Sequence, residues 1–141
     1  MDEKGRLKLP VGFQRYLGAL PEKGLYVTST DRRTATVYPN AIWRENEKLL
    51  ATLKQDPKIP KRVQFTTQDL GSDSEMDNQG RVQFSPELRR YLNIENQPVK
   101  VMATPSGAIQ VMSETVYQKW VAETEATPED DLAYLESFGF K

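Results

Sequence analysis

Two short stretches of this sequence combine residue types that can recognise another molecule. The pattern Asp-x-x-Gly-Arg occurs at Asp2–Arg6 and again at Asp77–Arg81. The aspartate can accept hydrogen bonds from nearby backbone amides, and the glycine supplies the positive φ that a tight turn requires. The arginine has two interpretations. Its guanidinium can donate a bidentate pair of hydrogen bonds to guanine in the major groove, or it can pair with its own aspartate as a structural clamp.

The composition excludes many kinds of enzyme chemistry. The 141 residues include no cysteine and no histidine, so disulfides, thiolate zinc sites, cysteine nucleophiles and imidazole ligands are excluded. Asp73, Glu75 and Asp77 could offer oxygens to a divalent cation, but Asn78 stands where a calcium loop needs glycine. No phosphate-cradling glycine loop is present. We therefore expect no catalytic activity, no metal, no cofactor and no small-molecule substrate.

The charge is distributed unevenly along the chain. The net charge is −1, but residues 122–141 carry six acidic residues and one lysine, which leaves the first 121 residues at +4. A mildly basic body with an acidic tail is one layout of nucleic-acid-binding proteins. No apolar run is long enough to span a membrane, and no charged-then-apolar leader opens the chain. We expect a cytoplasmic protein with no membrane partner.

The chain contains two copies of one design. Residues 2–9 correspond to residues 77–84 at an offset of 75, and Arg15-Tyr16-Leu17 corresponds to Arg90-Tyr91-Leu92 at the same offset. After a one-residue slip, Val37-Tyr38 corresponds to Val111-Met112. Two copies are too few for a solenoid, so we predict a pseudo-symmetric pair that shares one core. The predicted divisions are a first repeat at 1–54, a connecting segment at 55–71, a second repeat at 72–121 and an acidic tail at 122–141.

Each copy predicts the same series of elements. A short alternating strand follows the turn and directs Leu7 and Leu9, or Val82 and Phe84, inwards. A short helix comes next. Ser85 is suited to cap the second of these helices, with Pro86 as its first residue, and Pro10 takes a similar opening part in the first. Gly18 and Asn93 are the expected left-handed stops.

A hairpin and a longer helix complete each copy. The predicted hairpin strands are 25–30 with 34–38, and 98–103 with 108–112. The following helices contain Trp43 and Trp120 at apolar positions. Residues 63–65 fit a helix or a strand, and residues 71–74 indicate a turn and a sheet edge.

The two turns in register, each followed by Arg-Tyr-Leu and a hairpin, resemble the MraZ family. Tyr38-Pro39 and Trp43 after the first hairpin strengthen the match, which covers roughly residues 2–121. The resemblance implies an α+β fold of two pseudo-symmetric, AbrB-like swapped-hairpin half-barrels with peripheral helices. It also implies a bacterial, nucleoid-associated transcriptional regulator that forms a ring-like homo-oligomer. Such a regulator binds short direct repeats of double-stranded DNA at promoters of the division and cell-wall gene cluster, including its own.

The resemblance assigns DNA contact to the Asp-x-x-x-Arg motif, which is Asp2 with Arg6 and Asp77 with Arg81 in this chain. Lys4 and Lys8 flank the first arginine, where they would contact phosphate, the alternative being a solvated turn and strand edge. Arg15 and Arg89-Arg90 lie on the short helices, with backbone contact, subunit contact or ordinary exposed charge as their possible roles. The candidate DNA-binding residues are Asp2, Lys4, Arg6, Lys8, Arg15, Asp77, Arg81 and Arg90.

Several features leave alternatives open. Family members usually have a strand before the first aspartate, so we expect the first half, as written, to lack a ladder partner. Tyr16, Tyr91, Trp43 and Trp120 fit a core or a subunit interface better than base stacking. Thr127-Pro128 begins a helix that either docks on a neighbouring subunit or shields the basic surface, or is a frayed tail. Its acidic and aromatic residues also suit an antitoxin-like protein-interaction module, although such proteins usually carry one AbrB copy.

Overall fold

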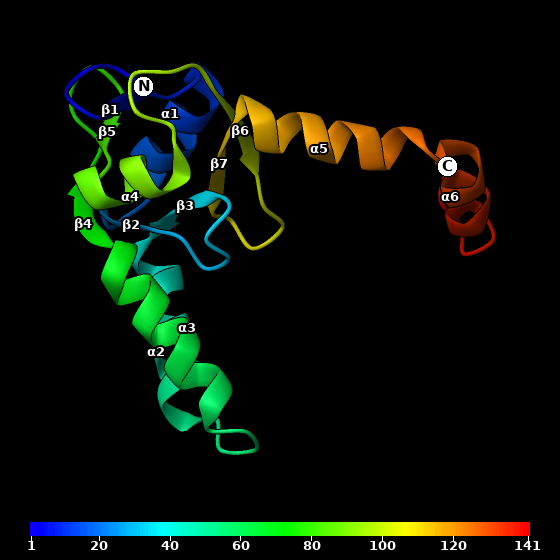
Figure 1. Ribbon diagram of the computed structural model, residues 1–141, viewed down its shortest axis with the longest axis horizontal. Helices are drawn as coiled ribbons and strands as arrows, with labels where there is room; N and C mark the ends of the chain where they lie inside the picture. Colours follow the sequence, from blue (N-terminus) through cyan, green and yellow to red (C-terminus); the bar gives the residue numbers. More distant parts are fainter.

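The computed structural model describes all 141 residues and shows a mixed α+β fold (Figure 1). Seven strands form two antiparallel sheets, and six helices lie around them. The first copy contains β1 (Arg6–Lys8), α1 (Val11–Ala19), β2 (Gly24–Thr28), β3 (Ala35–Pro39) and α2 (Asn40–Thr52). After α3 (Lys58–Leu70), the second copy contains β4 (Ser72–Glu75), β5 (Arg81–Gln83), α4 (Pro86–Leu92), β6 (Val99–Ala103), β7 (Ile109–Ser113) and α5 (Glu114–Glu125). The chain ends with α6 (Pro128–Glu136).

The larger sheet joins the hairpins of the two copies. Its strand order is β4-β2-β3-β7-β6, and the hairpins meet where Val37 of β3 lies opposite Ile109 of β7. Both hairpins lie within about two residues of the ranges that the sequence predicts. The smaller sheet is a ribbon of two strands, one from each copy, in which Leu7 of β1 lies opposite Val82 of β5. Both sheets therefore combine strands from the two copies.

The connecting segment forms a helix, which settles the ambiguity at residues 63–65. The strand that follows it, β4, pairs with β2 of the first copy, and Leu25 lies opposite Ser74. The expectation that the first half lacks a ladder partner is therefore wrong, because the second half supplies one. The two edge strands of the sheet are β4 and β6, and both come from the second half.

One apolar core lies between the ribbon and the larger sheet. The residues predicted to face inwards are all buried, with exposed fractions of 6% for Leu7, 2% for Leu9 and 0% for Val82 and Phe84. They pack with apolar side chains of the larger sheet, of the short helices and of the segment after α4: Leu17, Leu25, Val27, Val37, Leu88, Leu92, Ile94, Ile109 and Val111. Burying these alternate positions fixes the register of both short strands.

Both short helices begin as predicted, but only the second, α4, also ends as predicted. Ser85 Oγ accepts a hydrogen bond from the amide of Leu88 at 3.3 Å, with Pro86 in the first turn, and Asn93 adopts the left-handed conformation at φ 56°. Gly18 is not a left-handed stop. Helix α1 continues to Ala19, and Leu20 is extended. Lys23 Nζ donates to the carbonyls of Gly18 and Leu20, so a lysine rather than a glycine satisfies this helix end.

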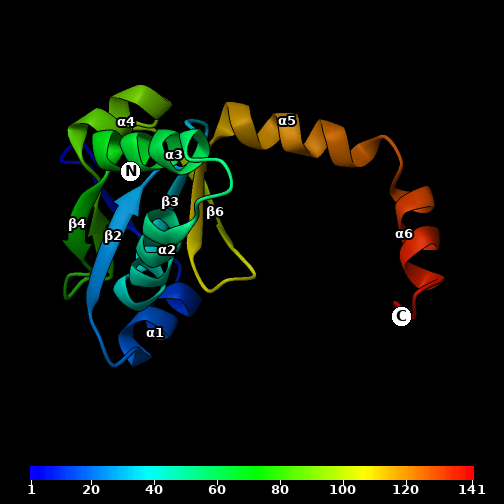
Figure 2. The same ribbon diagram turned by 90° about the horizontal axis from the view of Figure 1, so that it is seen from below.

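Two helical segments extend from the body. Helices α2 and α3 pack together as a hairpin on one side of the sheet, and α5 projects on another side with α6 at its outer end (Figures 1 and 2). The apolar side chains of α6 are exposed: Leu132 by 45%, Leu135 by 46% and Phe138 by 76%. None of the helices is long and apolar enough to cross a bilayer.

Candidate nucleic-acid interface

The first turn, residues 2–6, is closed by its own aspartate. Asp2 Oδ1 accepts hydrogen bonds from the amides of Lys4 at 3.0 Å and Arg6 at 2.8 Å, while Oδ2 accepts from Arg6 Nε at 2.9 Å. The amide of Gly5, at φ 79°, donates to the Asp2 carbonyl at 3.1 Å. The predicted turn chemistry is therefore present in full.

The second turn, residues 77–81, repeats this geometry. Asp77 Oδ1 accepts from the amides of Gln79 and Arg81, both at 2.9 Å, and Oδ2 accepts from Arg81 Nε at 2.8 Å. Gly80 has φ 76°, and its amide donates to the Asp77 carbonyl at 3.0 Å. Each of these hydrogen bonds matches its counterpart in the first turn to within 0.1 Å.

The electrostatics of the turns favour a permanently charged pair. The hydrogen bond from the backbone amide of Arg6 lowers the pKa of Asp2 below its ordinary value, opposed in part by desolvation and reinforced by the guanidinium. Arg81 lowers the pKa of Asp77 in the same way. Both carboxylates are therefore ionised at neutral pH, and each holds its arginine in one orientation.

The clamp leaves most of each guanidinium available. Only Nε is used by the aspartate, and neither Nη atom of Arg6 or Arg81 donates a hydrogen bond within the chain. The exposed fraction of the side chain is 29% for Arg6 and 23% for Arg81. The two interpretations of these arginines are thus compatible, because the aspartate can hold the side chain while the Nη pair remains free to donate to a ligand.

The β1–β5 ribbon brings the two turns onto one face. Arg6 lies opposite Gln83, and Lys8 lies opposite Arg81. Residues that face each other in an antiparallel ladder project to the same side, so these four form one polar face. Leu7 and Val82 project from the other face into the core. Arg6 and Arg81 are diagonal neighbours on this face, which places their Cα atoms about 7–8 Å apart.

The structure brings only some of the predicted site residues to this ribbon. Lys4 is exposed on the first turn, and Lys8 is exposed on β1 beside the arginines. Arg15 and Arg90 are exposed on α1 and α4, outside the ladder and without an ion pair. Their predicted part in DNA contact is untested by this geometry.

Two glutamines of the candidate interface were not among the predicted residues, and Arg89 has a different environment from the one expected. Gln83 lies on the polar face, and its Nε2 donates to the Lys4 carbonyl at 2.8 Å. Arg89, expected to be an exposed charge, is 92% buried, and Gln14 is half-buried against the other turn. The repeat offset of 75 could have identified these residues, because it makes Gln83 the counterpart of Lys8 and Arg89 the counterpart of Gln14.

The aromatic candidates have different positions. Trp43 is buried and stacks on Tyr26 at a centroid distance of 4.7 Å, so its predicted core position is confirmed. Tyr16, Tyr91 and Trp120 are exposed by 39%, 54% and 53%, so within one chain they are not core residues. Tyr16 donates to the Gly107 carbonyl, and Arg32 lies over the ring of Tyr91.

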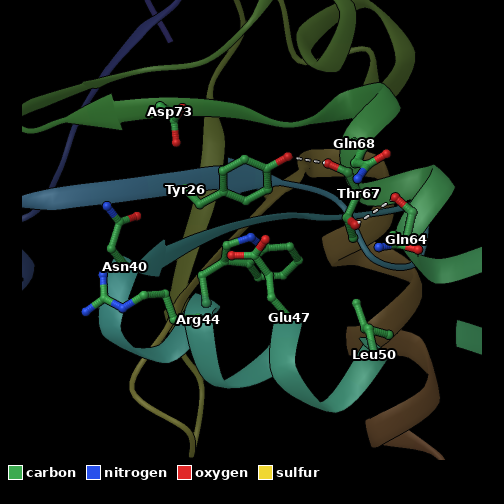
Figure 3. A pocket seen from close by; sticks show the side chains of 10 residues that line it. Tyr26, Asn40, Arg44, Glu47, Leu50, Gln64, Thr67, Gln68 and Asp73 are labelled. Atoms are coloured by element: carbon green, nitrogen blue, oxygen red, sulfur yellow. Dashed lines mark hydrogen bonds between the residues drawn. The ribbon is translucent and has the colours of Figure 1, made fainter. Parts of the chain in front are cut away.

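A second candidate site is a polar pocket of about 360 Å³ between β2, β4 and the α2–α3 hairpin (Figure 3). Tyr26 and Thr28 donate to the Thr67 carbonyl at 2.7 and 2.8 Å, which fastens α3 to the sheet. Burial raises the pKa of Tyr26, so its phenol stays a donor. Arg44 forms a bidentate pair with Glu22. These groups are engaged in structural contacts, and none forms a nucleophile–base pair.

The acidic residues considered as cation ligands in the sequence lie in different parts of the structure. Asp73 lies on β4 at the rim of the polar pocket, whereas Asp77 is committed to the second turn. The structure contains no group of three or more acidic residues arranged to hold a metal ion.

Comparison with known proteins finds relatives along nearly the whole chain. The chain is 30% identical over 136 residues to the transcriptional regulator MraZ of Acidobacterium capsulatum. The alignment covers 96% of this chain and 92% of that protein. It is 34% identical over 103 residues to the transcriptional regulator MraZ of Herpetosiphon aurantiacus, in an alignment that covers 70% of this chain and 66% of that protein. The transcriptional regulator MraZ of Nitrosomonas europaea is 31% identical over 100 residues, and that alignment covers 70% of this chain and 67% of that protein. No family model matches the chain.

Proposed function

This chain belongs to the MraZ family, and on that premise we propose that it is a sequence-specific DNA-binding regulator of transcription, without catalytic activity or cofactor. The observation that carries the proposal is the β1–β5 ribbon, which presents two clamped arginines on one polar face. The relatives are named as transcriptional regulators, which supports the same assignment.

The ribbon has dimensions and chemistry suited to the major groove. That groove is about 12 Å wide and admits a two-stranded β ribbon. With Nε held by aspartate, the two Nη atoms of Arg6 and Arg81 are left to donate to O6 and N7 of guanine. Each such pair contributes about 1–3 kcal/mol of discrimination against other bases. The preferred DNA would therefore contain guanines spaced to match the two turns.

Phosphate contacts would come from nearby basic side chains: Lys4, Lys8, Arg15 and Arg90. They are few, and the body carries a net charge of only +4. We therefore propose that several subunits of a ring-like homo-oligomer bind successive short direct repeats, so that weak contacts combine through avidity. The proposed targets are promoters of the division and cell-wall gene cluster, including the protein's own, on the nucleoid of the bacterial cytoplasm.

Self-association has a candidate surface in α6 and a groove beside α5. The groove is about 310 Å³ and is lined mainly by Met102, Met112, Tyr117, Trp120 and Val121. Lys100 lies over the ring of Tyr117 at 4.8 Å and gives the groove a cationic border. Helix α6 carries acidic residues in its first turn and exposed apolar side chains beyond it. This complementarity supports α6 of a second copy as the occupant of the groove.

The test is fluorescence anisotropy with a duplex from upstream of the protein's own gene and with a scrambled duplex, at two salt concentrations. We expect the native duplex to bind more tightly, and Arg6→Ala or Arg81→Ala to reduce that preference about 5- to 150-fold. Arg62→Ala is the matched control, because Arg62 is exposed near the start of α3 and is not part of the ribbon. It should lower both affinities slightly and equally.

Two results would count against the proposal. Equal affinity for the native and scrambled duplexes would remove the sequence-specific part. Salt-insensitive or undetectable binding would remove DNA altogether, and would favour the alternative of an antitoxin-like protein-interaction module. The observation that favours this alternative is the exposed acidic and aromatic surface of α6.

A further inference from the structure

The groove beside α5 has a counterpart in the first half of the chain. At the offset of 74 that relates the two hairpins, Tyr38 corresponds to Met112 and Trp43 to Tyr117. The rings of Tyr38 and Trp43 lie 5.0 Å apart in the angle between the first hairpin and α2. Met112 and Tyr117 line the equivalent angle between the second hairpin and α5. The first angle is closed over a buried Trp43, whereas the second is open and leaves Trp120 exposed by 53%.

Helix α3 closes the angle in the first half. It packs against α2 and β2, and its Thr67 carbonyl accepts hydrogen bonds from the hydroxyls of Tyr26 at 2.7 Å and Thr28 at 2.8 Å. In the second half, Lys100 and Met102 stand at the positions of these two residues. Lys100 forms no ion pair within the chain. A helix that closes the second angle would therefore meet a cation and an apolar side chain instead of two hydroxyls.

Helix α6 matches this groove both in its place along the chain and in its chemistry. It follows α5 as α3 follows α2. The acidic residues of its first turn complement the unpaired charge of Lys100. Its apolar side chains Leu132 and Leu135 are exposed by 45% and 46%. The groove beside α5 offers these side chains a burial that their own chain does not give them.

The connection between α5 and α6 keeps α6 away from its own groove. Five residues, 53–57, join α2 to α3, whereas only Ala126 and Thr127 join α5 to α6. Ala126 still has helical φ −67° and ψ −43°, so Thr127 alone makes the turn. Helix α6 accordingly lies at the outer end of α5, away from the body, in both views (Figures 1 and 2). Short hinges of this kind favour the exchange of an element between identical chains.

From this correspondence we infer that α6 is an exchanged helix: α6 of one copy takes, on a second copy, the place beside α5 that α3 takes beside α2 in its own chain. The inference rests on the self-association in the proposed function and deepens it. It adds an orientation for α6, antiparallel to the α5 that receives it, and a cause, the short connection at 126–127. Donation from copy to copy in one direction closes a ring, as the proposed function requires.

The first test identifies the occupant of the groove by crosslinking. The chain has no cysteine, so Met102→Cys labels the groove and Leu135→Cys labels α6. When the two variants are co-expressed, one with an affinity tag, a short bismaleimide reagent should link a tagged chain to an untagged one. A chain that carries both cysteines should also form links between chains rather than within one. Phe65→Cys, exposed by 67% on α3, is the matched control for Leu135→Cys and should not link to Met102→Cys.

The second test lengthens the connection. Inserting Gly-Ser-Gly between Ala126 and Thr127 gives α6 the five-residue connection that α3 has. Helix α6 should then return to its own groove, so the mass in light scattering should fall to that of one chain. The chain with both cysteines and this insertion should link internally. The same insertion between Lys54 and Gln55, exposed in the α2–α3 connection, should leave the mass unchanged, and circular dichroism checks that both variants are folded.

The outcomes separate this inference from the proposed function. If the protein has the mass of several chains but the groove and α6 do not link, or link within one chain, the copies associate through another surface and the exchange is wrong. An unchanged mass after the insertion at 126–127 would show that the short connection does not cause the exchange. If the unaltered protein has the mass of one chain, the ring in the proposed function fails together with the inference. DNA binding is decided separately, by the preference for the native duplex.

Discussion

Replacing Gly5 with alanine should damage the first turn more than its small size suggests. Gly5 has φ 79°, a conformation that costs an alanine about 1–2 kcal/mol. A Cβ there would also lie 1.3 Å from Nη1, 2.3 Å from Cζ and 2.8 Å from Cδ of Arg89. Because Arg89 is 92% buried, its guanidinium cannot simply swing into solvent. The substitution must therefore displace a buried charge.

The magnitude follows from what Arg89 loses. Its Nη1 donates to two carbonyls, those of Lys4 and Phe84, and hydrogen bonds to charged groups contribute about 1.5–3 kcal/mol each. Losing one of them in addition to the backbone strain gives a destabilisation of about 3–5 kcal/mol, a large part of a domain's usual 5–15 kcal/mol. Gly80→Ala meets the flexible, neutral Gln14 and should cost less, about 2–3 kcal/mol.

A double-mutant cycle isolates the contact. The free energy of unfolding is measured by urea titration followed by circular dichroism, at one fixed protein concentration. Arg89→Ala removes the obstructing side chain, so Gly5→Ala should cost only the strain of about 1–2 kcal/mol in that background. An equal cost of Gly5→Ala with and without Arg89 would refute the reasoning, because the contact with Arg89 would then contribute nothing.

Three further outcomes follow from the structure. Phe84→Ala should cost about 3–5 kcal/mol in the same urea titration, since this side chain is fully buried, whereas Met102→Ala, on the exposed edge strand, should cost less than about 1 kcal/mol. Deleting residues 126–141 should lower the oligomeric mass in light scattering while the far-ultraviolet spectrum keeps its strand signal, and an unchanged mass would contradict a role of α6 in assembly. The lowered pKa of Asp2 and Asp77 means that their stabilisation is complete above the unfolded pKa of about 3.8 and is lost as the pH falls through the lower folded value. Asp2→Asn/Asp77→Asn should therefore flatten the acid limb of a pH titration below pH 4, and an unaltered limb would show that the turns do not contribute to it.

Local sequence patterns predicted most elements because local chemistry decides them. The hydroxyl of Ser85, the ring of Pro86 and the left-handed tolerance of Asn93 each specify one helix end, and the structure uses all three. The prediction that Gly18 ends its helix in the left-handed conformation was wrong, because glycine permits that conformation without requiring it. At that helix end Lys23 donates to carbonyls three and five residues earlier in the chain, and no pattern within the helix itself predicts such a contact.

The site was only partly predictable for a different reason. Both Asp–Arg clamps are local, so the duplicated motif predicted them. The burial of Arg89 depends on Gly5, which lies 84 residues earlier and belongs to the other copy. Strand alternation is the same whether β4 pairs within its own half or crosses to β2, so the pattern could not reveal the crossing. Contacts between the copies require the three-dimensional arrangement.

Because the β1–β5 ribbon takes one strand from each half, each turn depends on both halves. The Gly5 carbonyl accepts from the amide of Phe84 at 2.9 Å, and the Gly80 carbonyl accepts from the amide of Leu9 at 3.0 Å. A homodimer of one repeat could build the same ribbon, but symmetry would place identical residues at both turns. Fusing the copies in one chain removes that constraint, so Lys4 and Gln79 can differ while the backbone stays matched. The two ends of the ribbon are therefore chemically distinguishable, which a symmetric homodimer of one repeat could not provide.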